Sequence, residues 1–311
     1  MPNSLAFRSF ANPLRFGKAK GPKHNEKTRM SLVSVNALSQ QIQQAIASKY
    51  PANEARAISH AYLNMRCSIN TLDILMDKAV EEPSGFAEDL SRLAAGEPLQ
   101  YVTGKAYFFD RIFSLNAATL IPRPETEELV SQVLNLIGNE KKRVLDIGTG
   151  SGCIAVSLAL EAPQAEVNAW DVAPEAILKA KENADQLGAQ VNFKQQDVFD
   201  WTKDSNVWDI IVSNPPYVLE AEKAEMESHV LDHEPHLALF VSDEDPLVFY
   251  RVIGEMAQQR LIPGGFLCFE INRAFGAQNV ALAEAQGFEN IQLLKDFHGN
   301  DRMLIAQKSA H

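Results

Sequence analysis

The sequence predicts an α/β fold: a mostly parallel sheet with an antiparallel edge strand, preceded by a small helical domain. After about residue 105, short apolar runs of strand-forming residues alternate with segments of helical periodicity. Before that point, apolar residues recur at helical spacing. The chain has 311 residues, of which 46% are hydrophobic, so it is long enough for two domains with substantial cores.

Residues 1–29 are expected to be a basic, disordered extension. They contain seven Lys or Arg residues and one acid, Glu26, and they lack the long apolar stretch of a secretory signal. Two other interpretations of this tail are an organelle transit peptide and an upstream start codon, with the regular pattern beginning at Met30.

Residues 30–104 are expected to form the helical domain. Leu38, Ile42 and Ile46 follow the spacing of one helix face. The segment from Glu81 to Gly85, with its proline and glycine, interrupts the helical pattern, which then resumes.

Residues 105–122 are expected to form a hairpin linker, because the stretch from 107 to 115 is rich in strand formers. The second domain then spans residues 123–308. It begins with a helix that Pro124 opens, a position at which the missing N–H costs nothing. Three acids in or next to the first turn favour the positive end of the helix dipole: Glu125, Glu127 and Glu128.

A glycine-rich turn follows the first strand of the second domain. The strand is expected at residues 143–146 and the next helix at 153–160, with Gly148, Gly150 and Gly152 between them. Such a turn places bare backbone N–H groups and a helix N-terminus beside a nucleotide-like ligand. The spacing departs from G-x-G-x-x-G, so it does not indicate a pyrophosphate site.

Acids stand at the ends of the next two strands. Asp171 ends the strand at 165–171 and is placed to accept hydrogen bonds from ribose hydroxyls. Asp197 ends the strand at 191–197 and is placed to accept from an adenine amino group, with Val198 against the ring. One such acid alone is usually a helix cap. Together with the glycine turn, the two acids indicate a nucleoside-type cofactor at the carboxyl edge of the sheet.

The segment Asn214-Pro215-Pro216-Tyr217 follows an apolar strand at 208–213. A planar nitrogen is a poor nucleophile, so an enzyme must orient it and hold its N–H bonds. The Asn214 side-chain oxygen and the Pro215 carbonyl offer two acceptors, and Tyr217 offers a ring face against a flat group. The alternative is an ordinary proline-rich turn. In this context the segment predicts transfer of a group to a planar nitrogen.

Metal and thiol sites are not expected. The three cysteines are isolated from one another, which fits buried thiols in a reducing compartment: Cys67, Cys153 and Cys268. Three histidines are spaced for one helix face, but Pro235 interrupts that helix: His229, His233 and His236. No apolar run approaches the ~18 residues that a membrane span requires.

The chain resembles class I S-adenosylmethionine-dependent methyltransferases, which have a Rossmann-like sheet. It is particularly similar to the HemK/PrmC family of release-factor glutamine methyltransferases. The similarity runs from about Met30 to Lys308. Besides the glycine turn and Asn-Pro-Pro-Tyr, it rests on four segments: Gly96–Gly104, Leu120–Glu127, Glu234-Pro-x-x-Ala238-Leu239 and Gly299-x-Asp301-Arg302.

This resemblance implies that S-adenosylmethionine is the cofactor, S-adenosylhomocysteine the product, and peptide chain release factors the partners. The acceptor is then the glutamine of the release factors' Gly-Gly-Gln motif, and the helical domain helps recognise the protein substrate. The implied cofactor-binding residues are Gly148, Thr149, Gly150, Ser151, Gly152, Asp171, Asp197, Val198 and Asn214. The implied substrate-binding residues are Asn214, Pro215, Pro216 and Tyr217, of which Asn214, Pro215 and Tyr217 are catalytic.

Two positions depart from the family pattern. Many relatives have an aromatic residue where this chain has Val198, and often a glycine where it has Asn272, after Glu270 and Ile271. Arg123 either positions the cofactor or its loop, or ties the linker to the core.

Three readings compete: release-factor methylation; methylation of a ribosomal-protein glutamine or of adenine in DNA; and a non-catalytic binding module. Outside residues 1–29, the chain has 22 basic and 39 acidic residues, which weighs against nucleic acid as the substrate. We expect a monomeric protein of the bacterial cytoplasm.

Overall fold

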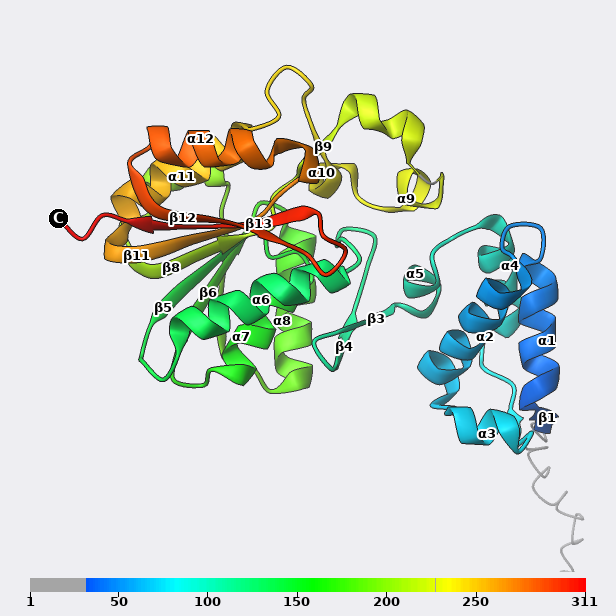
Figure 1. Cartoon of the computed structure of the whole chain (residues 1–311). Coiled ribbons are helices and arrows are strands. Elements are labelled where there is room, and N and C mark those ends of the chain that lie inside the picture. The colour runs from blue at the N-terminus through cyan, green and yellow to red at the C-terminus, as the bar shows by residue number, and fades with distance from the viewer. Residues whose placement is uncertain (1–31, 227) are drawn as a thin grey trace, which may run out of the picture.

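The computed structural model describes residues 32–226 and 228–311. The prediction for residues 1–29 therefore falls outside the described part of the chain. The described residues form a helical unit and an α/β unit, which a hairpin connects (Figure 1). The predicted α/β fold is confirmed.

The helical unit is built from amphipathic helices around one apolar core. Leu38, Ile42 and Ile46 of α1 are fully buried, as their spacing predicts. Asp89 is also buried in this unit, where it accepts hydrogen bonds from the Tyr62 hydroxyl at 2.6 Å and the Arg66 guanidinium at 2.9 Å. The elements are β1 (Leu32–Ser34), α1 (Val35–Ile46), α2 (Ala52–Cys67), α3 (Thr71–Leu75), β2 (Ala79–Glu81), α4 (Phe86–Ala95) and α5 (Leu99–Thr103).

A two-stranded antiparallel hairpin, β3 (Lys105–Phe108) and β4 (Arg111–Ser114), follows α5. Phe108 and Phe113 are buried in the main core of the α/β unit, with their rings 6.0 Å apart. On the other side of the hairpin, the Lys105 ammonium donates to the Met65 carbonyl of α2 at 3.0 Å. The hairpin therefore contacts both units.

The α/β unit has a seven-stranded sheet in the order β12-β13-β11-β8-β5-β6-β7. The five strands from β11 to β7 are parallel, whereas β13 pairs antiparallel with both β11 and the edge strand β12. The strands are β5 (Arg143–Ile147), β6 (Glu166–Asp171), β7 (Val191–Gln195), β8 (Trp208–Ser213), β11 (Leu261–Glu270), β12 (Phe288–Lys295) and β13 (Asp301–Lys308).

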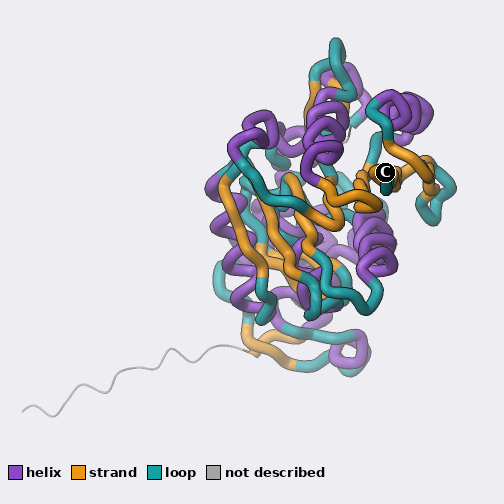
Figure 2. Tube along the Cα trace, turned by 90° about the vertical axis from the view of Figure 1, so that its left-hand side faces the viewer, coloured by secondary structure: helices purple, strands orange, loops and turns teal. Residues whose placement is uncertain are grey.

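Helices cover both faces of this sheet (Figures 1 and 2). One face carries α6 (Pro124–Ile137), α7 (Cys153–Glu161) and α8 (Pro174–Leu187), and the other carries α11 (Val248–Arg260) and α12 (Gly276–Ala285). Apolar side chains fill the core between the sheet and each helix layer. The parallel strands all end at one edge, where ligands of such sheets bind.

A long excursion between β8 and α11 adds several short elements. They are β9 (Val218–Leu219), η2 (Glu220–Glu225), α9 (Ser228–His233), α10 (His236–Leu239) and β10 (Phe240–Val241). Two other short helices lie outside the excursion: η1 (Val198–Lys203) before β8 and η3 (Arg273–Phe275) after β11. His233 ends α9 and His236 begins α10, so these histidines lie on two helices that Pro235 separates, as the sequence predicts.

The third strand of the α/β unit is shorter than the sequence predicts. The third strand ends at Gln195 instead of Asp197, because the Asp197 carboxylate accepts from the Phe199 N–H at 2.9 Å and caps η1. In the described ranges, no helix has the length and apolar character needed to cross a membrane.

Candidate active site

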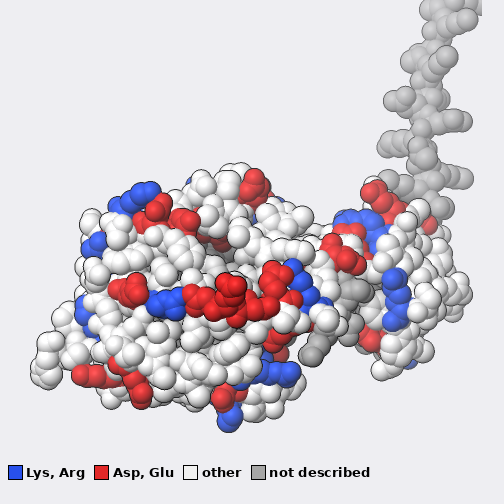
Figure 3. All heavy atoms as spheres, turned by 90° about the horizontal axis from the view of Figure 1, so that it is seen from above, with Lys and Arg blue, Asp and Glu red and all other residues white. Residues whose placement is uncertain are grey.

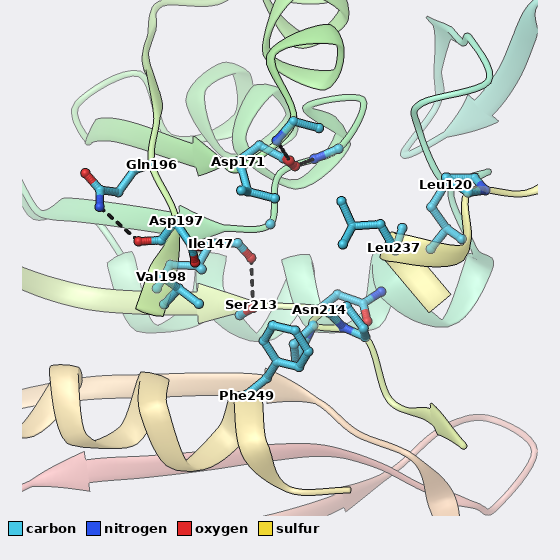
Figure 4. A pocket seen from close by; sticks show the side chains of 18 of the residues that line it. Leu120, Ile147, Asp171, Gln196, Asp197, Val198, Ser213, Asn214, Leu237 and Phe249 are labelled. Carbon is cyan, nitrogen blue, oxygen red and sulfur yellow. Dashed lines mark hydrogen bonds between the residues drawn. The ribbon is translucent and has the colours of Figure 1, made fainter. Parts of the chain in front are cut away.

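A cavity of about 330 Å³ opens at the carboxyl ends of β5, β6 and β8 (Figure 4). Most of the predicted site residues line it: Gly148, Gly150, Asp171, Asp197, Val198, Asn214, Pro215 and Pro216. The parallel arrangement of the strands explains why these residues meet, because each lies at or shortly after the end of a strand in the same sheet.

The glycine turn forms one wall of the cavity. Gly148 and Gly150 have φ values of +75° and +55°, which favour glycine. Gly148 and Thr149 donate their N–H groups to the Trp170 carbonyl at 2.9 and 3.0 Å. Thr149 and Ser151 are buried in the turn and do not line the cavity. The predicted contact of these two side chains with a cofactor therefore stays a prediction.

Gly152 serves the packing of the turn and also lies outside the cavity lining. It has a φ of +82°, and a Cβ at this position would lie 3.0 Å from the Ala180 Cβ of α8. Glycine is therefore required where the start of α7 approaches α8.

We expect Gly152→Ala to lower the free energy of unfolding by about 2–4 kcal/mol, from backbone strain and overpacking together. Gly188→Ala is the matched control, since Gly188 has a similar φ of +76° but its Cβ would meet no atom within 4 Å. Urea unfolding of both variants checks this. A loss for Gly152→Ala no greater than that for Gly188→Ala would show that the contact with Ala180 does not constrain the turn.

Asp171 is fixed by its backbone surroundings. Its Oδ2 accepts from the Gly150 N–H at 2.8 Å, and its Oδ1 accepts from the Ala173 N–H at 2.9 Å (Figure 4). Burial raises the pKa of this carboxyl, whereas these N–H groups act against the rise. Each oxygen keeps a further lone pair, so the carboxylate can still accept two hydroxyl groups.

The cavity walls beyond the turn are largely apolar. Val198 is buried beside Ile147, and Phe249 of α11 lies near Asn214 (Figure 4). The Phe249 ring lies 5.3 Å from the ring of Phe199. An aromatic surface thus reaches the cavity from α11, although Val198 itself supplies none.

A second cavity of about 190 Å³ adjoins the first. Tyr217 and Arg123 line the second cavity, whereas four residues line both cavities: Leu120, Asn214, Pro215 and Ala238. The Asn214-Pro215 peptide unit therefore separates two adjacent spaces. The Asn214 Oδ1 and the Pro215 carbonyl receive no hydrogen bond from any described residue.

Tyr217 is held by the end of β11. Its hydroxyl donates to Glu270 Oε1 at 3.1 Å, and its carbonyl accepts from the Asn272 side chain at 3.1 Å. Burial and the nearby Glu270 carboxylate raise the pKa of the Tyr217 hydroxyl. The phenol is therefore a neutral hydrogen-bond donor at physiological pH.

Arg123 pairs with Glu234 of the excursion. Its Nη2 lies 2.6 Å from Glu234 Oε1, and Glu234 Oε2 accepts from the Ile121 N–H at 3.3 Å. Glu234 is only 3% exposed, so this carboxylate needs both partners. Of the two roles considered for Arg123, the pairing favours the structural tie.

The sequence analysis missed three residues at the site. Thr126 and Glu270 contact Asn214 and Tyr217, while Phe249 lines the first cavity. Thr126 belongs to the Leu120–Glu127 segment, one of those on which the family resemblance rests, but the sequence analysis gave Thr126 no role. Glu270 belongs to the Glu270-Ile271 pair of the family pattern, to which no role was assigned, whereas nothing local marks Phe249.

Comparisons with known proteins agree with this geometry. Residues 125–235 match the family model described as methyltransferase small domain. The chain is 44% identical over 280 residues to the release factor glutamine methyltransferase of Bacteroides thetaiotaomicron, covering 88% of this chain and 100% of that protein. The protein of the same name from Flavobacterium psychrophilum is 40% identical over 85% of this chain and 95% of its own length. That from Streptococcus pneumoniae is 39% identical over 81% and 91%. The chain therefore belongs to the release factor glutamine methyltransferase family.

Proposed function

We propose that this enzyme transfers the methyl group of S-adenosylmethionine to the side-chain amide nitrogen of the glutamine in the Gly-Gly-Gln motif of peptide chain release factors. The observation that carries the proposal is the pair of cavities that meet at Asn214 and Pro215. A two-substrate transfer needs two adjacent spaces, one for the donor and one for the acceptor.

The first cavity fits the cofactor by its chemistry. Asp171 can accept from the ribose hydroxyls, Asp197 from the adenine amino group, and Val198 and Phe249 offer apolar contact to the base. The bare backbone of Gly148 and Gly150 leaves room for the methionine part. When bound, S-adenosylmethionine supplies an electrophilic methyl group on a sulfonium centre.

The second cavity fits the side chain of an acceptor glutamine. There, Asn214 Oδ1 and the Pro215 carbonyl accept the two amide N–H bonds, and the Tyr217 ring lies against the flat amide. Because the amide lone pair is delocalised, catalysis depends on orientation and on two acceptors that stabilise positive charge developing on nitrogen. The proton can leave to water afterwards, so no strong base is required.

The helical unit, proposed here as residues 30–104, is the part of the chain that can recognise a protein substrate. Acidic residues outnumber basic ones in the body of the protein. On the face shown in Figure 3, Lys and Arg are scattered among acids and form no continuous basic area. This charge distribution supports a protein acceptor over DNA. We place the enzyme in the bacterial cytoplasm with its substrate, and its monomeric state stays a prediction.

Transfer of labelled methyl groups from S-adenosylmethionine tests this function. The acceptors are a purified release factor, its Gly-Gly-Gln→Gly-Gly-Ala variant, a ribosomal-protein mixture and duplex DNA. We expect label on the unmodified release factor alone. Label on the ribosomal proteins or DNA instead would overturn the assigned partner, and label on none of them would indicate a binding module.

A further inference from the structure

A chain of hydrogen bonds leads from a buried carboxylate to the wall between the two cavities. The Asn214 side-chain nitrogen Nδ2 donates to Thr126 Oγ1 at 3.3 Å. The Thr126 hydroxyl in turn donates to Glu270 Oε2 at 2.6 Å. Thr126 and Glu270 are 3% and 1% exposed, so no solvent competes for these groups.

The sheet register explains why Glu270 reaches this position. Strands β11 and β8 are parallel, and Phe269 pairs with Ser213 at their carboxyl ends. The next residues along the chain are Glu270, which ends β11, and Asn214, which follows β8. Thr126 comes from the first turn of α6, which packs against β11, and completes the chain between them.

The direction of these hydrogen bonds is determined by donor count. A hydroxyl has one proton, and a distance of 2.6 Å is characteristic of an O–H group bonded to an ionised carboxylate. Because the Thr126 hydroxyl donates its single proton to Glu270, it can only accept a hydrogen bond from Asn214. Asn214 must therefore present Nδ2 to Thr126 and its Oδ1 elsewhere.

We infer that Thr126 and Glu270 are positioning residues that fix the amide orientation of Asn214, so that its oxygen faces the acceptor glutamine. The inference rests on the proposed role of Asn214 in holding the substrate amide. With the opposite orientation, Asn214 would present an NH₂ group to an NH₂ group, and one acceptor for the substrate would be lost.

Glu270 also holds the other end of the same segment through the Tyr217 hydroxyl. One carboxylate thus receives two donors, one from α6 and one from the residue that ends Asn-Pro-Pro-Tyr. Burial raises the pKa of Glu270, whereas the hydrogen bond from Thr126 and the positive charge of Arg302 act against that rise. The buried Glu270 carboxylate is therefore compensated by the hydrogen bonds from Thr126 and Tyr217 and by the charge of Arg302.

The test compares Thr126→Val, which keeps the shape of the side chain and removes the hydroxyl, with Thr126→Ser, which keeps the hydroxyl. We expect Thr126→Val to lower kcat about tenfold to a hundredfold, as misorientation of a reacting group does. Thr126→Ser is expected to stay within about threefold of the unmodified enzyme, since the bond is retained. The affinity for S-adenosylmethionine, measured by calorimetry, should change little in either variant.

A double-mutant cycle separates positioning from a structural role. If Thr126 acts through Asn214, then Thr126→Val should not lower kcat further in an Asn214→Ala background. If Thr126→Val does not fold, Thr126→Ala, which leaves space instead of an apolar group, takes its place in the cycle. Multiplicative losses of kcat in the double variant would overturn the inference.

The unmodified enzyme is assayed first on the release factor. If it does not methylate the Gly-Gly-Gln glutamine, both the proposed function and the inference fall. If it does, and Thr126→Val retains kcat, the inference falls while the proposed function stands.

Discussion

Asn214→Ala is expected to lower kcat on a release factor by about 10²- to 10⁴-fold, the largest effect of any single substitution at the site. The variant would lose the proposed side-chain acceptor for a glutamine N–H bond, whereas the Asn214-Pro215 peptide unit between the two cavities remains. Loss of this acceptor affects the orientation of a weak nucleophile, on which the rate of the proposed transfer depends. Single-turnover kinetics with saturating release factor and cofactor would measure the change in the chemical step.

Folding of this variant should be nearly unaffected, because the Asn214 side chain makes a single hydrogen bond to the described residues, the 3.3 Å bond to Thr126. We expect the free energy of unfolding to change by less than about 2 kcal/mol. Asn192→Ala is the matched control, because Asn192 is an exposed residue of β7 outside both cavities. Activity of Asn214→Ala equal to that of Asn192→Ala would show that Asn214 does not hold the substrate amide.

The meeting of the residues that were predicted to hold the cofactor could be expected from the sequence, because these residues lie at strand ends. Gly148, Asp171 and Asp197 each lie at or within two residues of the end of a strand of one parallel sheet, so the fold alone brings them together. Thr149 and Ser151 are part of the same turn, but their side chains are buried. A sequence pattern shows which residues form a turn but not which side of it faces a ligand.

The support for Asn214 was not predictable from the sequence. Thr126 and Glu270 are 144 residues apart, and their contact depends on the packing of α6 against β11. The approach of Glu270 to Asn214 depends on the register between β11 and β8. A register shift of one residue would turn Glu270 to the other face of the sheet. Phe249 reaches the cavity from α11 in the same non-local way. Thr126 and Glu270 lie in segments that the resemblance singled out, but nothing in the sequence assigned them this role or marked Phe249.

A second large effect concerns stability and comes from Asp146, at the end of β5. This carboxyl is fully buried, Oδ2 accepts from the Thr149 hydroxyl at 2.6 Å, and Oδ1 has no hydrogen-bond partner among the described residues. Burial, which outweighs the bond from Thr149, together with the Asp171 charge raises the pKa of Asp146 to about 7, from 3.8. The ionised form is therefore disfavoured in the folded protein.

The sign of the pH dependence follows from proton uptake. Between pH 3.8 and about 7, the folded state keeps the Asp146 proton and the unfolded state has lost it. The stabilising contribution of Asp146 is thus complete below pH 3.8 and is lost as the pH rises to about 7, at up to about 1.4 kcal/mol per pH unit. Over that range the loss is on the order of 4 kcal/mol.

Asp146→Asn removes this titration, so its free energy of unfolding should fall less steeply with pH than that of the unmodified protein. Urea unfolding at pH 5, 6, 7 and 8 measures both slopes, with Asp185→Asn as a control because Asp185 is exposed on α8. The groups other than Asp146 titrate in both proteins and cancel in the difference. Parallel curves for the two proteins would show that Asp146 ionises as readily in the folded state as in the unfolded chain. If the difference in the free energy of unfolding between the two proteins instead vanishes toward pH 4 and is complete above pH 7, the Asp146 carboxyl keeps its proton in the folded state. Burial of this carboxyl next to the glycine turn would then be the cause of its raised pKa.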